Sequence, residues 1–283
     1  MIGGLRDTPE DPRDFQTGQL IILPKLATLP AKYALDTLGI KNQRETDFCT
    51  AFASCTVSEM QEGVELSPEY LFAVSKELSG DPDVWGQDIR QAMKAHCKVG
   101  TIKKKDAPYS LENKPDTFLR LISNWPSELK QKALEHKKKS YLKITGPYDH
   151  YDNIRATIWY FLKERRGIVS GVLWQWPLEQ FFLDQPTDNG SGHCIAYIGW
   201  ENRGLYLQNS YGEEVGLFGR HIVTRETVNK FVQRYGAYMM IDLSPEEVIK
   251  MIEQGVKLDD GIWTKWIKAF FSFITNYLKE IWQ

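Results

Sequence analysis

The chain has 283 residues, 42% of them hydrophobic and 25% charged, which is ordinary for a globular protein and enough for one large domain or two lobes. Its 35 basic side chains against 37 acidic ones leave no global field that would favour nucleic acid or an acidic membrane surface. No secretory signal and no run of 18 apolar residues is visible, so we expect no transmembrane segment and a cytoplasmic or virion-associated protein.

The four cysteines, Cys49, Cys55, Cys97 and Cys194, are scattered without CxxC spacing. This pattern argues against a structural zinc site and gives no sign of a disulfide framework. We therefore expect free thiols in a reducing compartment, and neither a metal nor a cofactor is implied.

Residues 1–28 are rich in Pro, Asp and Arg and predict an extended N-terminal arm. The next part of the chain predicts helices, one of them begun by Ser67 as N-cap with Pro68 at the first helical position. The stretches that predict helices are 49–64, "LSPEYLFAVSKEL", "QDIRQAMKAHCKVG" and "SELKQKALEHKKK".

After residue 139 the pattern changes to short apolar or alternating runs bounded by glycine, which are typical of a sheet. These runs are "YLKITG", "GIVSGVLW", "HCIAYIGW", "GLYLQNS" and "YGAYMMIDL", with one amphipathic helix at "NIRATIWYFLKERRG". We expect an α+β protein with a helical left lobe at about 40–138, a strand-rich right lobe at about 139–242 and an active-site cleft between them.

Residues 243–283 predict a separate helical extension. "SPEEVIKMIEQG" has a capped start, and the final stretch repeats aromatic and aliphatic residues at helical spacing. The apolar face would dock on its own domain, bind a protein partner or a second copy, or lie in a membrane interface. The side chains that would serve a protein partner are Trp263, Trp266, Phe270 and Trp282.

Cys49 stands at the predicted start of a helix, where the helix dipole favours a thiolate. His193 follows a flexible turn and opens an apolar strand, so it is the best-placed histidine to act as a base. Asn209, at the end of the next predicted strand, could orient the imidazole through its side-chain carbonyl. Gln43 and the Cys49 backbone N–H could stabilise an oxyanion. Taken singly, each of these residues is more often structural, and only the joint arrangement favours catalysis.

The stretch "LPAKYALDTLGIKNQRETDFCTAFAS" resembles the start of a mature papain-like cysteine peptidase. The steps of six residues from Gln43 to Cys49 and sixteen from His193 to Asn209 match that family, and the resemblance covers about residues 29–242. It implies a papain-like peptidase domain in which Cys49 is the nucleophile, His193 the general base and then acid, Asn209 the orienting residue and Gln43 part of the oxyanion hole. The substrate would be a polypeptide.

The same resemblance suggests contacts to extended substrate. Trp85 and Gly86 lie in the loop where the family binds substrate backbone, Gly192 precedes the histidine, and Tyr211 replaces the tryptophan that shields the Asn–His hydrogen bond. The absence of a long propeptide and of a signal resembles bacterial or phage members. The short arm would thread the cleft, or the enzyme would be restrained only by its location.

Several positions depart from the family pattern. Thr46 replaces the usual second cysteine, so that disulfide is not expected. Phe48 replaces a small residue and is expected to crowd the primed side of the cleft, and Thr50 replaces an aromatic residue. Three functions therefore stay open: a cysteine endopeptidase working through a thioacyl-enzyme intermediate, a catalytically weak or inactive binding or assembly protein of the same fold, and a Cys-His hydrolase acting on cell-wall peptides.

Overall fold

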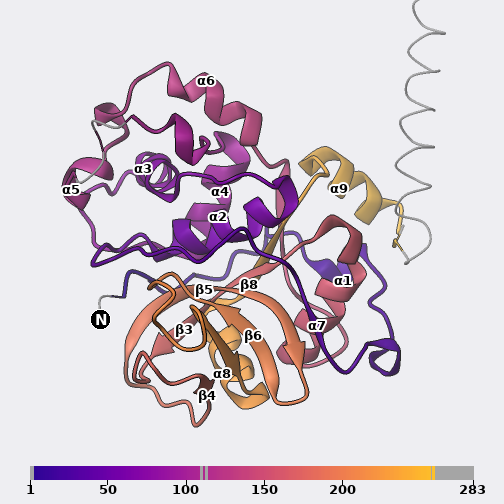
Figure 1. Ribbon diagram of the computed structural model, residues 1–283. Coiled ribbons are helices and arrows are strands. Elements are labelled where there is room, and N and C mark those ends of the chain that lie inside the picture. The colour runs from indigo at the N-terminus through magenta and orange to yellow at the C-terminus, as the bar shows by residue number, and fades with distance from the viewer. Residues whose placement is uncertain (1–2, 109–110, 112–113, 256, 259–283) are drawn as a thin grey trace, which may run out of the picture.

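The structure is a computed structural model that describes residues 3–108, 111, 114–255 and 257–258. The aromatic residues expected to face a partner (Trp263, Trp266, Phe270 and Trp282) lie outside the described residues. Helices gather on one side and a sheet on the other, with the N-terminal segment passing along the boundary (Figure 1). Among the described residues, no helix is long and apolar enough to cross a membrane.

Most of the helices form where the sequence predicts them, and their ends carry the expected capping residues. Ser67 caps a helix by accepting a hydrogen bond from the Tyr70 amide, and Ser244 and Glu247 form a reciprocal capping box. The α-helices of the described residues are α1 (Thr17–Leu20), α2 (Cys49–Glu62), α3 (Pro68–Ser79), α4 (Ile89–Lys98), α5 (Asp116–Leu119), α6 (Leu129–Ala133), α7 (His150–Tyr160), α8 (Arg225–Tyr235) and α9 (Pro245–Glu253).

The strands form one sheet in the order β2-β8-β3-β5-β6-β7-β4, with β1 pairing to β5. All described pairs are antiparallel except that of β4 with β7. The expected runs all become strands. The strands are β1 (Tyr33–Ala34), β2 (Ser140–Lys143), β3 (Ile168–Trp174), β4 (Phe182–Leu183), β5 (Ser191–Glu201), β6 (Gly204–Gln208), β7 (Arg220–Val223) and β8 (Ala237–Ile241).

Helix α2 is the element that joins the two halves. One side of it, with Cys49, Ala53 and Val57, packs into the core of the sheet half, and another, with Phe52 and Cys55, into the core of the helical half. Small residues and weak amphipathicity suit a helix that is buried on nearly all sides. The N-terminus of α2 is thereby fixed at the boundary between the two cores.

One expectation about the helical half holds only in part, and one was wrong. The helix expected across "SELKQKALEHKKK" is short, because His136 and Lys138 turn back to the Glu62 carboxylate, at 2.5 and 2.6 Å, and cannot continue the helix. Phe48 does not reach the cleft. It is fully buried and stacks on Phe72 with ring centroids 4.1 Å apart, because that apolar pocket stabilises the ring better than the solvated groove.

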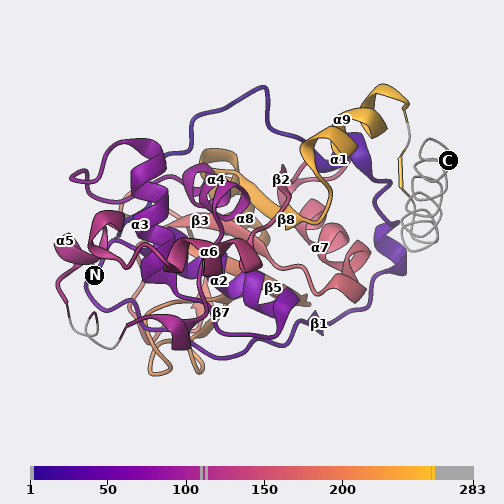
Figure 2. The same cartoon turned by 90° about the horizontal axis from the view of Figure 1, so that it is seen from above.

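The N-terminal arm contains the short helix α1 and a 3-10 turn at Leu26–Thr28, and it is anchored along the molecule. Asp14 is buried and makes a paired contact with Arg90, whose Nε and Nη2 lie 3.0 and 2.6 Å from its carboxylate oxygens. The helix α1 lies beside α9 at the same end of the molecule in both views (Figures 1 and 2). The first described residues, in contrast, lie between the helical and sheet halves (Figure 1).

Candidate active site

Cys49 is the first residue of α2, and His193 is the third residue of β5, which packs against that helix. Asn209 directly follows β6, the antiparallel neighbour of β5, so its side chain comes alongside His193. His193 Nε2 lies 2.9 Å from Asn209 Oδ1. All three side chains are buried; His193 and Asn209 are hydrogen-bonded, and Cys49 begins the helix that packs against β5.

Gln43 lies at the same place. Its backbone N–H donates to the Ser210 carbonyl at 2.7 Å, and its side-chain oxygen accepts from the Ser210 hydroxyl at 2.6 Å. The side-chain nitrogen donates one hydrogen to the Thr46 carbonyl at 2.8 Å. The second hydrogen of that amide and the backbone N–H of Cys49, at the helix start, are the donors available to an oxyanion.

Burial favours the neutral form of the Cys49 thiol. Burial raises its pKa to about 11, and the backbone amides of Cys194 and Gly4, which lie beside the sulfur and favour the thiolate, do not offset this. Burial also lowers the pKa of His193 to about 4, against the hydrogen bond to Asn209. In the described part of the chain no hydrogen bond joins the thiol to this ring, and the expected thiolate–imidazolium pair stays a prediction for an uncovered site.

Tyr211 shows what His193 contacts instead. Its ring stacks on the imidazole with centroids 4.3 Å apart, and its hydroxyl lies 3.0 Å from Nδ1. Because Nε2–H donates to the Asn209 carbonyl oxygen, Nδ1 is the acceptor and the tyrosine hydroxyl is the donor. The nitrogen that would take a proton from Cys49 is therefore occupied by Tyr211.

The arm covers the thiol. The Leu5 amide donates to the Gly192 carbonyl at 3.0 Å on the sheet side, while the Gln87 amide donates to the Gly4 carbonyl at 2.7 Å on the helical side. The Arg6 amide donates to the Gln87 carbonyl at 3.0 Å. Leu5 and Gln87 thus form a parallel bridge, and the first residues of the chain span the two halves directly over Cys49.

Three of the four residues predicted to contact extended substrate lie along this arm, whereas Tyr211 stacks on His193. Trp85 Nε1 donates to the Gly3 carbonyl at 2.8 Å. Gly86 adopts φ +69°, and a Cβ there would lie 2.2 Å from the Gly4 oxygen. A Cβ on Gly192 would lie 2.2 Å from the Leu5 oxygen. Glycine is therefore required at both positions for the close approach of another backbone.

The Leu5 side chain is buried in the sheet-side core. It sits over Gly171, where an added Cβ would lie 2.2 Å from Leu5 Cδ2 and 2.8 Å from the Tyr235 ring. An apolar pocket thus lies one residue along from the backbone that covers the thiol. The sequence predicted an extended arm but did not indicate which of its residues would be buried here.

Two further residues that the sequence did not reveal hold the loop carrying Trp85 and Gly86. The Lys76 ammonium is buried and donates to the carbonyls of Val84 and Gly86, at 2.6 and 2.7 Å. Asp47 accepts a hydrogen bond from the Gly86 amide and an ion pair from Arg120 at 3.0 Å. For Lys76 the sequence gives one signal, a lysine within a largely apolar helix, and that signal does not specify its partners.

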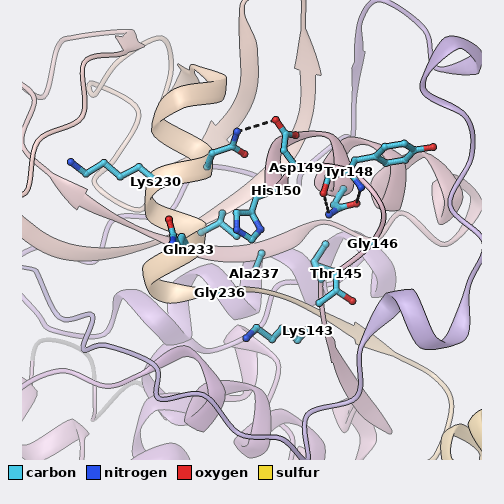
Figure 3. A pocket seen from close by; sticks show the side chains of 14 residues that line it. Lys143, Thr145, Gly146, Tyr148, Asp149, His150, Lys230, Gln233, Gly236 and Ala237 are labelled. Atoms are coloured by element: carbon cyan, nitrogen blue, oxygen red, sulfur yellow. Dashed lines mark hydrogen bonds between the residues drawn. The ribbon is translucent and has the colours of Figure 1, made fainter.

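All four cysteines are free thiols, and Thr46, where the resemblance would place a second cysteine, is bonded only through its hydroxyl and backbone. A separate cavity of about 530 Å³ lies between the loop after β2, the start of α7 and the end of α8 (Figure 3). No cysteine lines it, and the Asp149 carboxylate within it already accepts from Asn229 at 3.0 Å. This cavity is therefore separate from Cys49 and His193.

Comparisons with known proteins place this geometry in context. No protein-family model matches the chain. No curated protein matches it in sequence. Among solved structures, xylellain, a cysteine protease from Xylella fastidiosa, superposes with a TM-score of 0.68 at 18% identity, covering 85% of this chain and 96% of that one.

Two further cysteine proteases give similar superpositions. The Carica candamarcensis cysteine protease CMS1MS2, solved in complex with E-64, has a TM-score of 0.56 at 13% identity over 76% of this chain and 99% of that one. Digestive procathepsin L 3 from Tenebrio molitor has a TM-score of 0.58 at 14% identity over 81% and 76% of the two chains. The chain therefore has the papain-like α+β fold that its sequence resemblance implied.

Proposed function

We propose that this chain is a cysteine peptidase of papain-like fold whose own N-terminal arm occupies the substrate site. The observation that supports the proposal best is the buried set of Cys49 at a helix start, His193 and Asn209, with an extended peptide already lying across it. A surface that accepts one extended peptide by backbone hydrogen bonds from both sides is suited to others.

The chemistry follows from the hydrogen-bond roles. With Nε2–H held by Asn209, Nδ1 of His193 accepts the Cys49 proton once the Tyr211 hydroxyl moves aside. The sulfur then bonds to the scissile carbonyl carbon, the oxyanion is stabilised by the Cys49 and Gln43 donors, and the amine leaves with the proton from His193. Water, deprotonated by His193, attacks the thioester and regenerates the free thiol.

In the covered form, burial raises the pKa of the thiol and lowers that of the imidazole, so neither ionises near neutral pH. Release of the arm would admit water and let the dipole of α2 favour the thiolate. The arm thus keeps the nucleophile both inaccessible and protonated. Its release is a precondition for turnover in this proposal.

The test compares the full chain with its Leu5→Ala variant, in which the arm is less tightly held. Each is incubated with casein and with cross-linked peptidoglycan peptides, and products are identified by mass spectrometry. Cys49→Ala should abolish cleavage, and Cys97→Ala, at a half-buried cysteine away from the site, should not.

Casein cleavage that survives Cys49→Ala would refute the assignment of the nucleophile. Release of cell-wall peptides without casein cleavage would favour the alternative hydrolase. No cleavage of either substrate, although the Leu5→Ala thiol reacts freely with iodoacetamide, would favour a binding or assembly protein.

A further inference from the structure

His221 is a buried histidine that the proposed chemistry does not use. It lies on β7, next to β6, with its ring facing the side chain of Asn209. Asn209 Nδ2 is 3.3 Å from His221 Nε2, and His221 Nδ1 is 2.8 Å from the backbone carbonyl of Gln180. Asn209 therefore lies between two imidazoles, with His193 on its other side.

The hydrogens on this chain of groups can be assigned by elimination. The Gln180 carbonyl can only accept, so Nδ1 of His221 carries its hydrogen. In a neutral ring Nε2 is then an acceptor and requires a donor, which is the Asn209 amide nitrogen. The Asn209 oxygen must consequently face His193, and it also accepts from the Ser210 amide at 2.7 Å.

The surroundings of His221 fix its ring and keep it neutral. Trp174 packs edge-on against it with centroids 5.0 Å apart, and the Gly216 backbone approaches so closely that a Cβ there would lie 2.6 Å from His221 Cε1. Burial lowers the pKa of His221 to about 4, against the Gln180 carbonyl. Of the described titratable side chains, His193 lies across Asn209 from it, and Tyr211 shares the Trp174 contact.

We propose that His221 is a positioning residue that fixes the amide orientation of Asn209 and, through it, the His193 tautomer in which Nδ1 can receive a proton. The effect of His221 on catalysis rests on the proposed peptidase function, whereas its effect on the orientation of Asn209 does not. Without the acceptor on His221, the Asn209 amide loses one of the two bonds that set its orientation, and only the Ser210 amide still holds its oxygen toward His193.

The first test is nitrogen-15 NMR of the histidine side chains in the full chain, a measurement that does not depend on peptidase activity. We expect His221 as the Nδ1–H tautomer and His193 as the Nε2–H tautomer, each assigned by the signal lost in His221→Phe and His193→Gln. An Nε2–H tautomer for His221 would overturn the proposal. In His221→Phe the His193 signal should shift toward a tautomer mixture, while His221→Gln, which keeps an acceptor, should retain most of the native signal.

The second test is a double-mutant cycle on turnover, with His221→Phe and Asn209→Ala in the Leu5→Ala chain. Loss of one oriented hydrogen bond should lower kcat about tenfold in the His221→Phe protein, with KM nearly unchanged. In the Asn209→Ala background His221→Phe should have no further effect. An equal loss in both backgrounds would show a merely structural role and overturn the proposal. The expected tautomers without any peptidase activity would leave His221 as the residue that orients Asn209 and refute the proposed function instead.

Discussion

Leu5→Ala tests whether the arm governs access to Cys49. The Leu5 side chain is 8% exposed and packs over Gly171, so its truncation removes buried apolar contact from the docked arm and leaves the undocked arm unchanged. Buried Leu→Ala substitutions cost about 2–5 kcal/mol, and we take about 2–3 kcal/mol for a site at the edge of a core. Since about 1.4 kcal/mol is a factor of ten, the open population should rise roughly 30- to 150-fold.

The assay is the alkylation rate of Cys49 by iodoacetamide at pH 7.5, followed by mass spectrometry of the peptide containing Cys49. The rate should rise by the same factor as the open population, up to the point at which the open form predominates. Asp7→Ala is the matched control, because its pair with Arg234 is well exposed and exposed ion pairs contribute little. It should change the rate less than about fivefold.

An unchanged rate in Leu5→Ala, with native circular dichroism, would refute the reasoning. It would mean that the backbone hydrogen bonds of the arm dominate its docking. An Asp7→Ala effect as large as that of Leu5→Ala would show instead that charge, and not apolar burial, holds the arm. Either result would change which contacts have to break before Cys49 is uncovered.

Three other predictions follow from buried groups. Arg90→Met leaves the Asp14 carboxylate buried without its partner and should destabilise the fold by about 3–5 kcal/mol in urea unfolding, with recovery in the Arg90→Met/Asp14→Leu double variant. Burial lowers the pKa of His96 to about 3, so below about pH 6.5 the unfolded chain binds a proton that the folded chain does not. The free energy of unfolding should therefore fall between pH 6.5 and pH 3, by up to about 1.4 kcal/mol per pH unit. His96→Phe should remove this contribution from the pH dependence of the free energy of unfolding measured between pH 7 and 5. Because burial raises the pKa of the Cys49 thiol, its alkylation in the full chain should still increase about tenfold per pH unit between pH 8 and 10, whereas a plateau near the free-thiol value of about 8.5 would contradict its burial.

The parts of the fold that the sequence predicted are those decided by local chemistry. The Ser67–Pro68 start of α3 and the capping box at Ser244 are complete within four residues, and the glycine-bounded strands carry their own apolar pattern. Helix α8 was not predicted, because "RETVNKFVQRY" is largely polar and its buried face is interrupted by charge. Its start is marked only by Thr224, which caps it through the Thr227 amide.

In the candidate site, too, some features could be predicted from the sequence and others could not. Cys49, His193, Asn209 and Gln43 were nominated because their spacing is visible in the chain; in the structure hydrogen bonds join His193 to Asn209 and Gln43 to Ser210. The path of the arm was not predictable in detail, since the Gly4, Leu5 and Arg6 pairings use backbone groups that every residue has. The roles of Phe48 and His221 depend on partners more than 20 residues away, or across a neighbouring strand.

The arm is part of the same chain as the site that it fills. The fraction of molecules in which it is docked is therefore set by an effective concentration and not by the protein concentration. Dilution alone should never uncover Cys49, whereas a detached peptide carrying the arm's sequence would need a high concentration to cover it again. Every incoming chain must also compete with this tethered occupant, so its apparent affinity is the intrinsic one reduced by the fraction of molecules that are open. In a chain with the proposed peptidase function, the contacts of Leu5 and Asp14 would set a threshold of affinity that a substrate has to exceed, and a partner that captured the arm would lower that threshold without contacting Cys49 or His193.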